Sequence, residues 1–234
     1  MRLQTFLLGL ALVGICPSGN AQAVPFSEAV RCGSISADLA NTLAQVAWLS
    51  HLPMVAELAQ PLPRIEIAES TYIAKDLLQE IIRQAPLYQW EAEGKVIHFY
   101  NTKLKEAKFN FLNLQFPRFV TPSNLSELKL TFPTREYGLL HEAYSGGGIV
   151  ITGFGDAMLE KDLLRSVTLE KVTGREILLR VASESPTFFT VIVFPNADPT
   201  KQQMERDINL NWFWQSLKEQ PGPLYVQPPA STRK

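Results

Sequence analysis

The segment 141–148, HEAYSGGG, holds the residue types that nucleophilic catalysis requires. A catalytic serine needs a general base within reach and backbone N–H groups that stabilise an oxyanion, and His141, Ser145 and the glycine run could supply them. The same residues are typical of a helix that ends in a glycine-rich turn, because glycine adopts left-handed conformations without a Cβ penalty. Ser145 also lacks the setting of a nucleophile elbow. We therefore expect no enzymatic activity, and a serine hydrolase using Ser145 and His141 is the least favoured alternative.

Other catalytic and metal-binding patterns are weaker. The histidines His51, His98 and His141 are scattered, and none has a second ligand at a metal-binding spacing. His98 lies in the alternating run VIHFY, which predicts an exposed histidine on a strand face. Glu91 and Glu93 share one strand face, which indicates a solvated hairpin rim, whereas acid–base catalysis needs carboxylates that face each other across a cleft. The run GGGIVITGFG lacks the order of a nucleotide-binding loop. We expect no metal and no other cofactor.

Six aromatic residues are the candidate contact residues for a partner. Three lie on the segments LYQWEA and KVIHFY, which are expected to form a hairpin around Gly94. There they could also stack on a small ligand or a glycan, which is the second functional alternative. The other three lie in residues 199–218, where Met204, Ile208 and Trp212 recur every four residues and predict an amphipathic helix with aromatics on both sides of its stripe. Trp is enriched at interface hot spots. The six residues are Tyr88, Trp90, Tyr100, Trp212, Phe213 and Trp214.

Short helices and strands must position these residues. Residues 77–86 read LLQEIIRQAP and residues 177–186 read ILLRVASESP, so a helix followed by proline recurs at an offset of 100. A strand is expected before each helix, RIEIA at 64–68 and SVTLEKV at 166–172, and the second helix begins at a capping box formed by Thr173 and Glu176. Ser36 is the expected N-cap of an earlier helix, and MVAEL after Pro53 is an expected edge strand. The predicted fold is α+β, with two small, related strand–helix–strand modules whose helices pack on short mixed or antiparallel sheets.

Residues 64–100 resemble the short N-terminal (STN) domain of secretins and TonB-dependent transducers. The resemblance rests on the strand, the Leu-Leu-x-x-Ile-Ile helix stripe and the aromatic hairpin YQWEAEGKVIHFY. Residues 166–194 repeat part of this pattern. The resemblance extends to stand-alone periplasmic proteins that carry the module. It implies an α+β sandwich used for protein–protein contact in the bacterial cell envelope. No secretin pore or transducer barrel fits in this chain, so only the interaction role is carried over.

The first 23 residues have the pattern of a secretory signal peptide. Arg2 precedes an apolar run, and Ala21-Gln22-Ala23 is a small-x-small cleavage site. No other stretch approaches the roughly 18 apolar residues of a membrane span. Removal of residues 1–23 takes away one of the 22 basic residues and none of the 23 acidic ones, so the net charge becomes −2. This balance gives no case for nucleic acid or an anionic membrane as partner. The mature chain is expected to be periplasmic or secreted.

The predicted organisation has five segments. Residues 1–23 are the signal peptide, 24–104 the STN-like module, 105–198 the second module, 199–218 the amphipathic helix and 219–234 a Pro-rich flexible tail. Cys32 is the single cysteine after cleavage, and we expect it to be buried or to form an intermolecular disulfide. The predicted function is a non-enzymatic interaction module that binds an envelope protein. Homo-oligomer formation is left open.

Overall fold

The computed structural model describes residues 25–107, 110–147, 149–152, 164–185, 187–194, 208–218 and 220–226. The fold is α+β, with helices packed on mixed and antiparallel sheets, which confirms the predicted fold class. The predicted signal peptide lies outside the described residues. Within the described ranges, every helix is too short or too polar to cross a bilayer.

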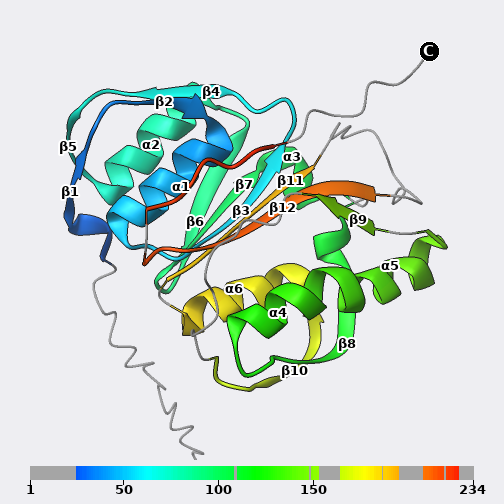
Figure 1. Ribbon diagram of the computed structural model, residues 1–234. Coiled ribbons are helices and arrows are strands. Elements are labelled where there is room, and N and C mark those ends of the chain that lie inside the picture. Colours follow the sequence, from blue (N-terminus) through cyan, green and yellow to red (C-terminus); the bar gives the residue numbers. More distant parts are fainter. Residues whose placement is uncertain are drawn as a thin grey trace, which may run out of the picture.

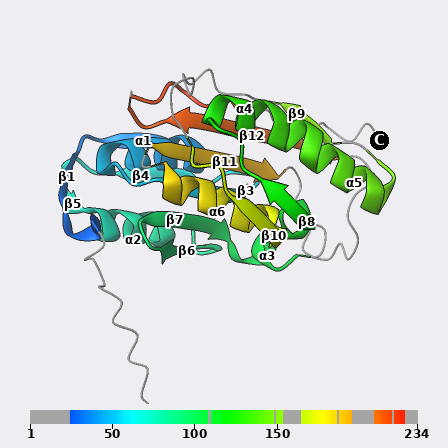
Figure 2. The same ribbon diagram turned by 90° about the horizontal axis from the view of Figure 1, so that it is seen from below.

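A six-stranded sheet forms the centre of the molecule (Figures 1 and 2). In spatial order its strands are β6 (Tyr88–Glu93), β7 (Val96–Asn101), β3 (Met54–Ala59), β11 (Phe188–Phe194), β12 (Ile208–Ser216) and β9 (Ile149–Thr152). β3 runs parallel to β7 and β11, and β9 runs parallel to β12. The pairs β6·β7 and β11·β12 are antiparallel. β6 and β9 are therefore the edges of this sheet, and β3, the expected edge strand, lies inside it.

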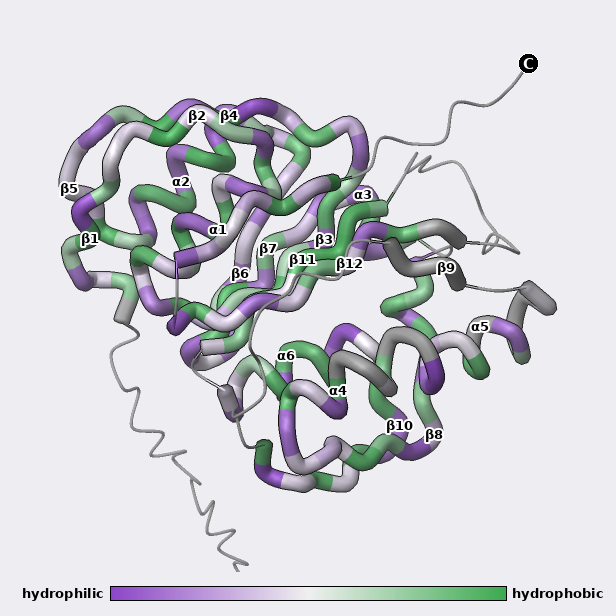
Figure 3. Tube along the Cα trace, in the orientation of Figure 1, coloured by the Kyte–Doolittle hydropathy of each residue, from purple (hydrophilic) through white to green (hydrophobic). Residues whose placement is uncertain are grey.

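Helices cover both faces of the sheet (Figure 1). α1 and α2 pack on one face, and α6 and α4 pack on the other. Because successive strand residues point to opposite faces, β3 places Met54, Ala56 and Leu58 under α1 and α2 but Val55 under α6. Figure 3 shows α2 as alternating hydrophobic and hydrophilic residues, the pattern of a helix buried on one side. The helices are α1 (Leu39–Ser50), α2 (Ala74–Gln84), α3 (Thr102–Lys105), α4 (Leu125–Thr131), α5 (Tyr137–Ser145) and α6 (Gly174–Glu184).

Three two-stranded antiparallel sheets accompany the helices on the side away from the central sheet (Figure 1). The pairs β1·β5 and β2·β4 run beside α1 and α2, and the pair β8·β10 runs beside α6 and α4. Their strands are β1 (Ala29–Cys32), β2 (Ile35–Asp38), β4 (Arg64–Ile67), β5 (Ser70–Ile73), β8 (Gln115–Val120) and β10 (Thr168–Thr173). The remaining turns are η1 (Pro25–Ser27), η2 (Phe111–Asn113) and the π-helical η3 (Phe132–Glu136).

The two copies of the sequence pattern occupy equivalent places in the fold. α2 and α6 both have 11 residues and begin 100 positions apart. Each follows an outer strand directly and leads into a strand of the central sheet, β6 in one case and β11 in the other. The strand that enters α2 is β5, however, and residues 64–68 contain β4, which pairs with β2. The expected alignment of 64–68 with 166–172 was therefore wrong, although the alignment of the helices was correct.

Local capping signals explain where two helices begin. The predicted capping box is present at α6, because the Thr173 side chain accepts from the Glu176 N–H and the Glu176 side chain accepts from the Thr173 N–H. The predicted cap at Ser36 was wrong. Ser36 is paired within the β2·β4 sheet, and the Asp38 carboxylate instead accepts from the Asn41 N–H at 2.9 Å. A short carboxylate is an equally good N-cap, so pairing of the preceding strand decided the boundary.

The predicted amphipathic helix at 199–218 was wrong for residues 208–216, which form β12; residues 199–207 lie outside the described ranges. A spacing of four is also an even number of strand residues, so Ile208 and Trp212 share a strand face as well as a helix face. In the fold Trp212 and Trp214 enter the core under α6, whereas Phe213 enters the core under α1. Aromatics on both sides of the stripe are therefore the mark of a strand buried on both faces.

The predicted segmentation also changes. The modules at 24–104 and 105–198 are joined in one sheet by the parallel pair β3·β11, so they share both cores. The predicted flexible tail was wrong for residues 220–226, because this segment crosses α1 and buries Leu224; residues 227–234 are not among those described. Cys32 is fully buried in the core beside α1 and α2, which agrees with the expectation of burial and not with that of an intermolecular disulfide. Burial raises the pKa of its thiol.

Candidate functional site

The six predicted contact residues do not form an exposed surface. Trp90 is half-buried, its ring 5.7 Å from that of Phe26, and the other five are buried. The Tyr88 hydroxyl donates a hydrogen bond to the backbone carbonyl oxygen of Ala59 at 3.1 Å. The Trp212 indole stacks on Trp214 at 5.7 Å between ring centroids. The prediction of exposed anchors was therefore wrong for the five buried residues, because they fill the two cores.

The alternative catalytic pair lies on α5. His141 and Ser145 are four residues apart, near the end of that helix, and the chain leaves the helix through Gly146 in a left-handed conformation. This helix end was the competing explanation of the HEAYSGGG sequence, and its conformation is as expected. The side chains of His141 and Ser145 are outside what the structure describes.

A buried charge network lies between the central sheet and α6. Glu57 of β3 is fully buried, and its side chain faces α6 because it shares the strand face of Val55. Arg175, in the first turn of α6, donates to both carboxylate oxygens of Glu57, from Nε to Oε1 and from Nη2 to Oε2 at 2.9 Å. Asn110, which precedes η2, donates to Oε2 at 3.0 Å. A carboxylate that is buried needs such bonds, because removing an ionised group from water without a partner carries a large desolvation free energy.

His98 of β7 connects this centre to the edge of the sheet. It was expected to be exposed but is fully buried, because α6 packs on that face of β7. Its Nε2 lies 2.8 Å from Glu57 Oε1, and its Nδ1 lies 3.0 Å from Glu91 Oε1. An ionised carboxylate only accepts hydrogen bonds, so each ring nitrogen of His98 faces a hydrogen-bond acceptor.

Glu91 of β6 is the outer end of the network. Its carboxylate accepts from Lys105 Nζ as well as from His98, and the Lys105 ammonium lies 4.2 Å from the centroid of the Tyr100 ring. The predicted solvated rim is therefore correct for Glu93, which is exposed, and wrong for Glu91, which is half-buried. Side-chain contacts from Glu91 through His98 to Glu57 thus connect the edge strand β6 with β3 inside the sheet.

The electrostatics explain how these charges are tolerated. Burial by itself would raise the pKa of Glu57, but hydrogen bonds from Arg175 and His98 outweigh burial and lower that pKa to about 2. The pKa of Glu91 is lowered for the same reason, with burial opposed by bonds from Lys105 and His98. Burial alone would lower the pKa of Arg175 and of Lys105, but their bonds to Glu57 and Glu91 raise both. All four groups are held in their charged forms.

Tyr137 lies next to the charge network, against the first residue of α6. Its hydroxyl is buried and has no hydrogen-bond partner among the described residues. Burial, with a smaller contribution from the charge of Glu57, raises the pKa of Tyr137 well above its ordinary value. A Cβ at Gly174 would lie 1.0 Å from this hydroxyl oxygen, so glycine is required for the ring to pack against the first residue of α6.

The network contains residue types that occur in active sites, namely Glu, His, Arg and Lys, but its hydrogen-bonding groups bind one another. Glu57 already accepts four hydrogen bonds, and Arg175 also donates to Asn113 Oδ1 at 2.6 Å and to the Lys105 carbonyl at 3.3 Å. In the part of the chain that the structure describes, no group of three or more His, Cys, Asp or Glu side chains is arranged to hold a metal ion. The network therefore fixes α6 and the segment around η2 on β3, β7 and β6.

Sequence reasoning missed Glu57 and Arg175. One signal was present, since Glu57 is the single charge in the apolar run MVAELA, and such a charge in a buried strand requires a partner. The identity of that partner could not be found locally, because Arg175 lies 118 residues away along the chain.

The second feature of this region is the free edge of β6. β6 pairs only with β7 among the described residues. Ile97, opposite Ala92, donates its N–H to the Pro53 carbonyl at 2.9 Å, away from β6. Antiparallel partners either exchange both backbone bonds or neither, so the N–H and C=O of Ala92 point outward, and those of Trp90 do the same by the two-residue alternation. Among the described residues, the outward backbone groups of Trp90 and Ala92 therefore have no strand partner, and the charge network holds β6 on β7 through Glu91 and His98.

Comparison of the chain with protein-family models, with curated proteins and with solved structures found no match. The resemblance to the STN domain thus stays a prediction.

Proposed function

We propose that this protein is an exported, non-enzymatic interaction module of the cell envelope that binds an extended segment of a partner protein at the β6 edge. The observation that carries the proposal is the outward-facing backbone of Trp90 and Ala92. An extended peptide adds to such an edge through main-chain hydrogen bonds, and its alternate side chains provide specificity. The export and the periplasmic location rest on the signal-peptide pattern of residues 1–23.

Two features suit this edge to binding. The hairpin turn at Gly94, with a φ of 63°, and the Glu91–His98 bond hold β6 firmly on β7, so the edge is ordered before a partner arrives. The exposed Glu93 lies on the same strand face as Glu91. A charge at an edge discourages indiscriminate pairing and favours a segment with a basic residue opposite it.

The other functions have less support. The stacking platform for a ligand or glycan required Tyr88 and Tyr100 to be exposed, and both are buried. The hydrolase required a site around His141 and Ser145, and the side chains of both lie outside what the structure describes, so no described geometry supports it. An interaction module is therefore the function that the described geometry supports best.

The test is a photo-crosslinking experiment in the envelope of the native cell. A photo-reactive side chain at Glu93 is expected to capture one discrete partner, whereas the same group at exposed Lys75 on α2 is expected to capture none. Ala92→Pro removes an outward N–H, which an edge strand tolerates, and should abolish the Glu93 product. Ala92→Thr keeps the N–H and should retain it. A crosslink that persists in folded Ala92→Pro protein would refute strand addition.

A further inference from the structure

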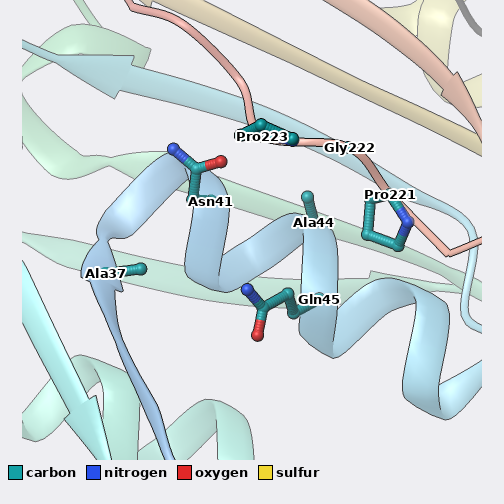
Figure 4. Close-up of a pocket in the computed structure, with 7 residues that line it drawn as sticks. All are labelled: Ala37, Asn41, Ala44, Gln45, Pro221, Gly222 and Pro223. Atoms are coloured by element: carbon teal, nitrogen blue, oxygen red, sulfur yellow. The ribbon is translucent and has the colours of Figure 1, made fainter.

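The C-terminal segment 220–226 lies against α1 as a bound peptide would. It forms no helix or strand, and it crosses the helix beside Asn41, Ala44 and Gln45 (Figure 4). Figure 1 shows that this segment follows β12 and passes to the α1 side of the central sheet. The contact is thus separate from the β6 edge.

Asn41 binds the backbone of this segment. The Leu224 N–H donates to Asn41 Oδ1 at 2.7 Å, and Asn41 Nδ2 donates to the Leu224 carbonyl at 3.0 Å. The side-chain amide therefore replaces the two bonds that a neighbouring strand would make. Both bonds go to backbone atoms, so Asn41 could bind in the same way an extended segment of another protein that has a backbone N–H at the position of Leu224.

The Asn41 amide is held in place before the segment binds. The Asp38 N-cap accepts a hydrogen bond from Asn41 Nδ2 at 2.8 Å and another from the Asn41 backbone N–H at 2.9 Å. One N–H of the amide thus points at Asp38, and the other is left for the Leu224 carbonyl. A recognition group oriented by a second residue loses little entropy on binding.

Leu224 supplies the specificity. Leu224 is 5 % exposed and belongs to the hydrophobic core that contains the buried residues of α1, whereas the next residue, Tyr225, is 77 % exposed. Pro221 and Pro223 precede it, and proline restricts the backbone of an extended segment before it binds. The recognised pattern is therefore a leucine that follows proline in an extended chain.

The fit of the segment to α1 is incomplete. A pocket of about 290 Å³ remains between the helix residues Ala37, Asn41, Ala44 and Gln45 and the segment residues Pro221, Gly222 and Pro223. Figure 4 shows the side chains of both sides around it. Leu224 is the one fully inserted side chain of the described segment, so the contact rests on few interactions and opens more easily than the core.

We propose that this face of α1 is a recognition site for an extended Pro-Leu segment of another protein, and that residues 220–226 occupy it as a tethered, displaceable ligand. A tethered ligand competes at a high effective concentration, so the site stays closed to weak peptides and opens to a segment that also fills the remaining pocket. The site is independent of the proposed strand addition at β6.

The test uses the full chain with Leu224→Ala, which weakens the tethered ligand, and a fluorescent peptide of residues 220–226, QPGPLYV. Saturable binding measured by anisotropy is expected for the variant, and binding at least tenfold weaker is expected for the wild-type chain. A peptide with alanine in place of leucine should not bind, and Asn41→Ala in the Leu224→Ala chain should lose binding. Circular dichroism checks that each variant is folded.

A second measurement needs no variant. Excess unlabelled peptide should accelerate hydrogen exchange at the Leu224 amide of the wild-type chain, because displacement frees that N–H. Absence of binding to folded Leu224→Ala protein, together with unchanged exchange in the wild type, would overturn the proposal. A wild-type dimer that exchanges its C-terminal segments between copies, seen by light scattering, would also overturn it, since the occupant would then be a second copy.

Discussion

Arg175→Met removes the cation that compensates a fully buried carboxylate. Glu57 then retains the bonds from His98 at 2.8 Å and Asn110 at 3.0 Å but loses both bonds from the guanidinium. Breaking one side of a buried ion pair costs about 3–5 kcal/mol, and the two remaining bonds favour the lower end of that range. A loss of about 3 kcal/mol lowers the folding equilibrium constant more than a hundredfold and the Tm by roughly 6–12 °C for a chain of this size.

The assay is urea unfolding at pH 7, followed by tryptophan fluorescence and by far-UV circular dichroism. The matched control is Arg180→Met on the same helix, whose partner Glu184 lies 2.8 Å away in a partly exposed i,i+4 pair. Such a pair contributes at most about 0.5 kcal/mol. The reasoning would be refuted if Arg175→Met cost less than about 1 kcal/mol, or no more than Arg180→Met.

A double variant separates charge from packing. Glu57→Gln combined with Arg175→Met removes both charges and keeps similar side-chain volumes, so it should be more stable than Arg175→Met alone. If the loss came only from the packing of the arginine stem, the second substitution would recover nothing.

Three further predictions follow from the same core. The pKa of Glu57 is about 2 in the fold against an ordinary 4.5, so its stabilisation is complete above pH 4.5 and is lost as the pH falls toward 2; urea midpoints should fall over that window by the equivalent of about 3 kcal/mol. Gly174→Ala should destabilise the protein by about 1–3 kcal/mol in thermal unfolding, despite the better helix propensity of alanine, because the new Cβ meets the Tyr137 ring; an unchanged Tm would contradict this. Thr190→Val removes the hydroxyl that accepts from Trp212 Nε1 at 3.0 Å and should cost about 1–3 kcal/mol, while fluorescence spectra check that the indole stays buried.

The parts of the fold that sequence predicted well are those with local causes. The capping box at Thr173 and Glu176 is closed by atoms three residues apart, and the hairpin at Gly94 requires a positive φ that glycine adopts without strain. The amphipathic face of α2 follows from a period of 3.6 residues. These features need no knowledge of what the helix or hairpin packs against.

The sites were harder to predict because burial changes the meaning of a residue. The aromatic run Trp212-Phe213-Trp214 indicated a surface helix with excess aromatics, and it is a strand between two helical layers. His98 fitted an alternating strand with one wet face, and that face is covered by α6. In each case the local pattern was compatible with two environments, and packing from distant segments selected one.

The sequence by itself determined the recurrence of a helix at an offset of 100 and the capping box that starts its second copy, because these depend on hydrogen bonds and periodicities within a few residues. Only the tertiary structure decided that both repeats join one sheet, that Glu57 meets Arg175 across 118 residues, and that Leu224 returns to Asn41 across 183. A buried charge needs a counter-charge, and a buried backbone N–H or C=O needs a hydrogen-bond partner. Residues far away in the sequence can supply either one, and only the folded chain shows which residues come close enough.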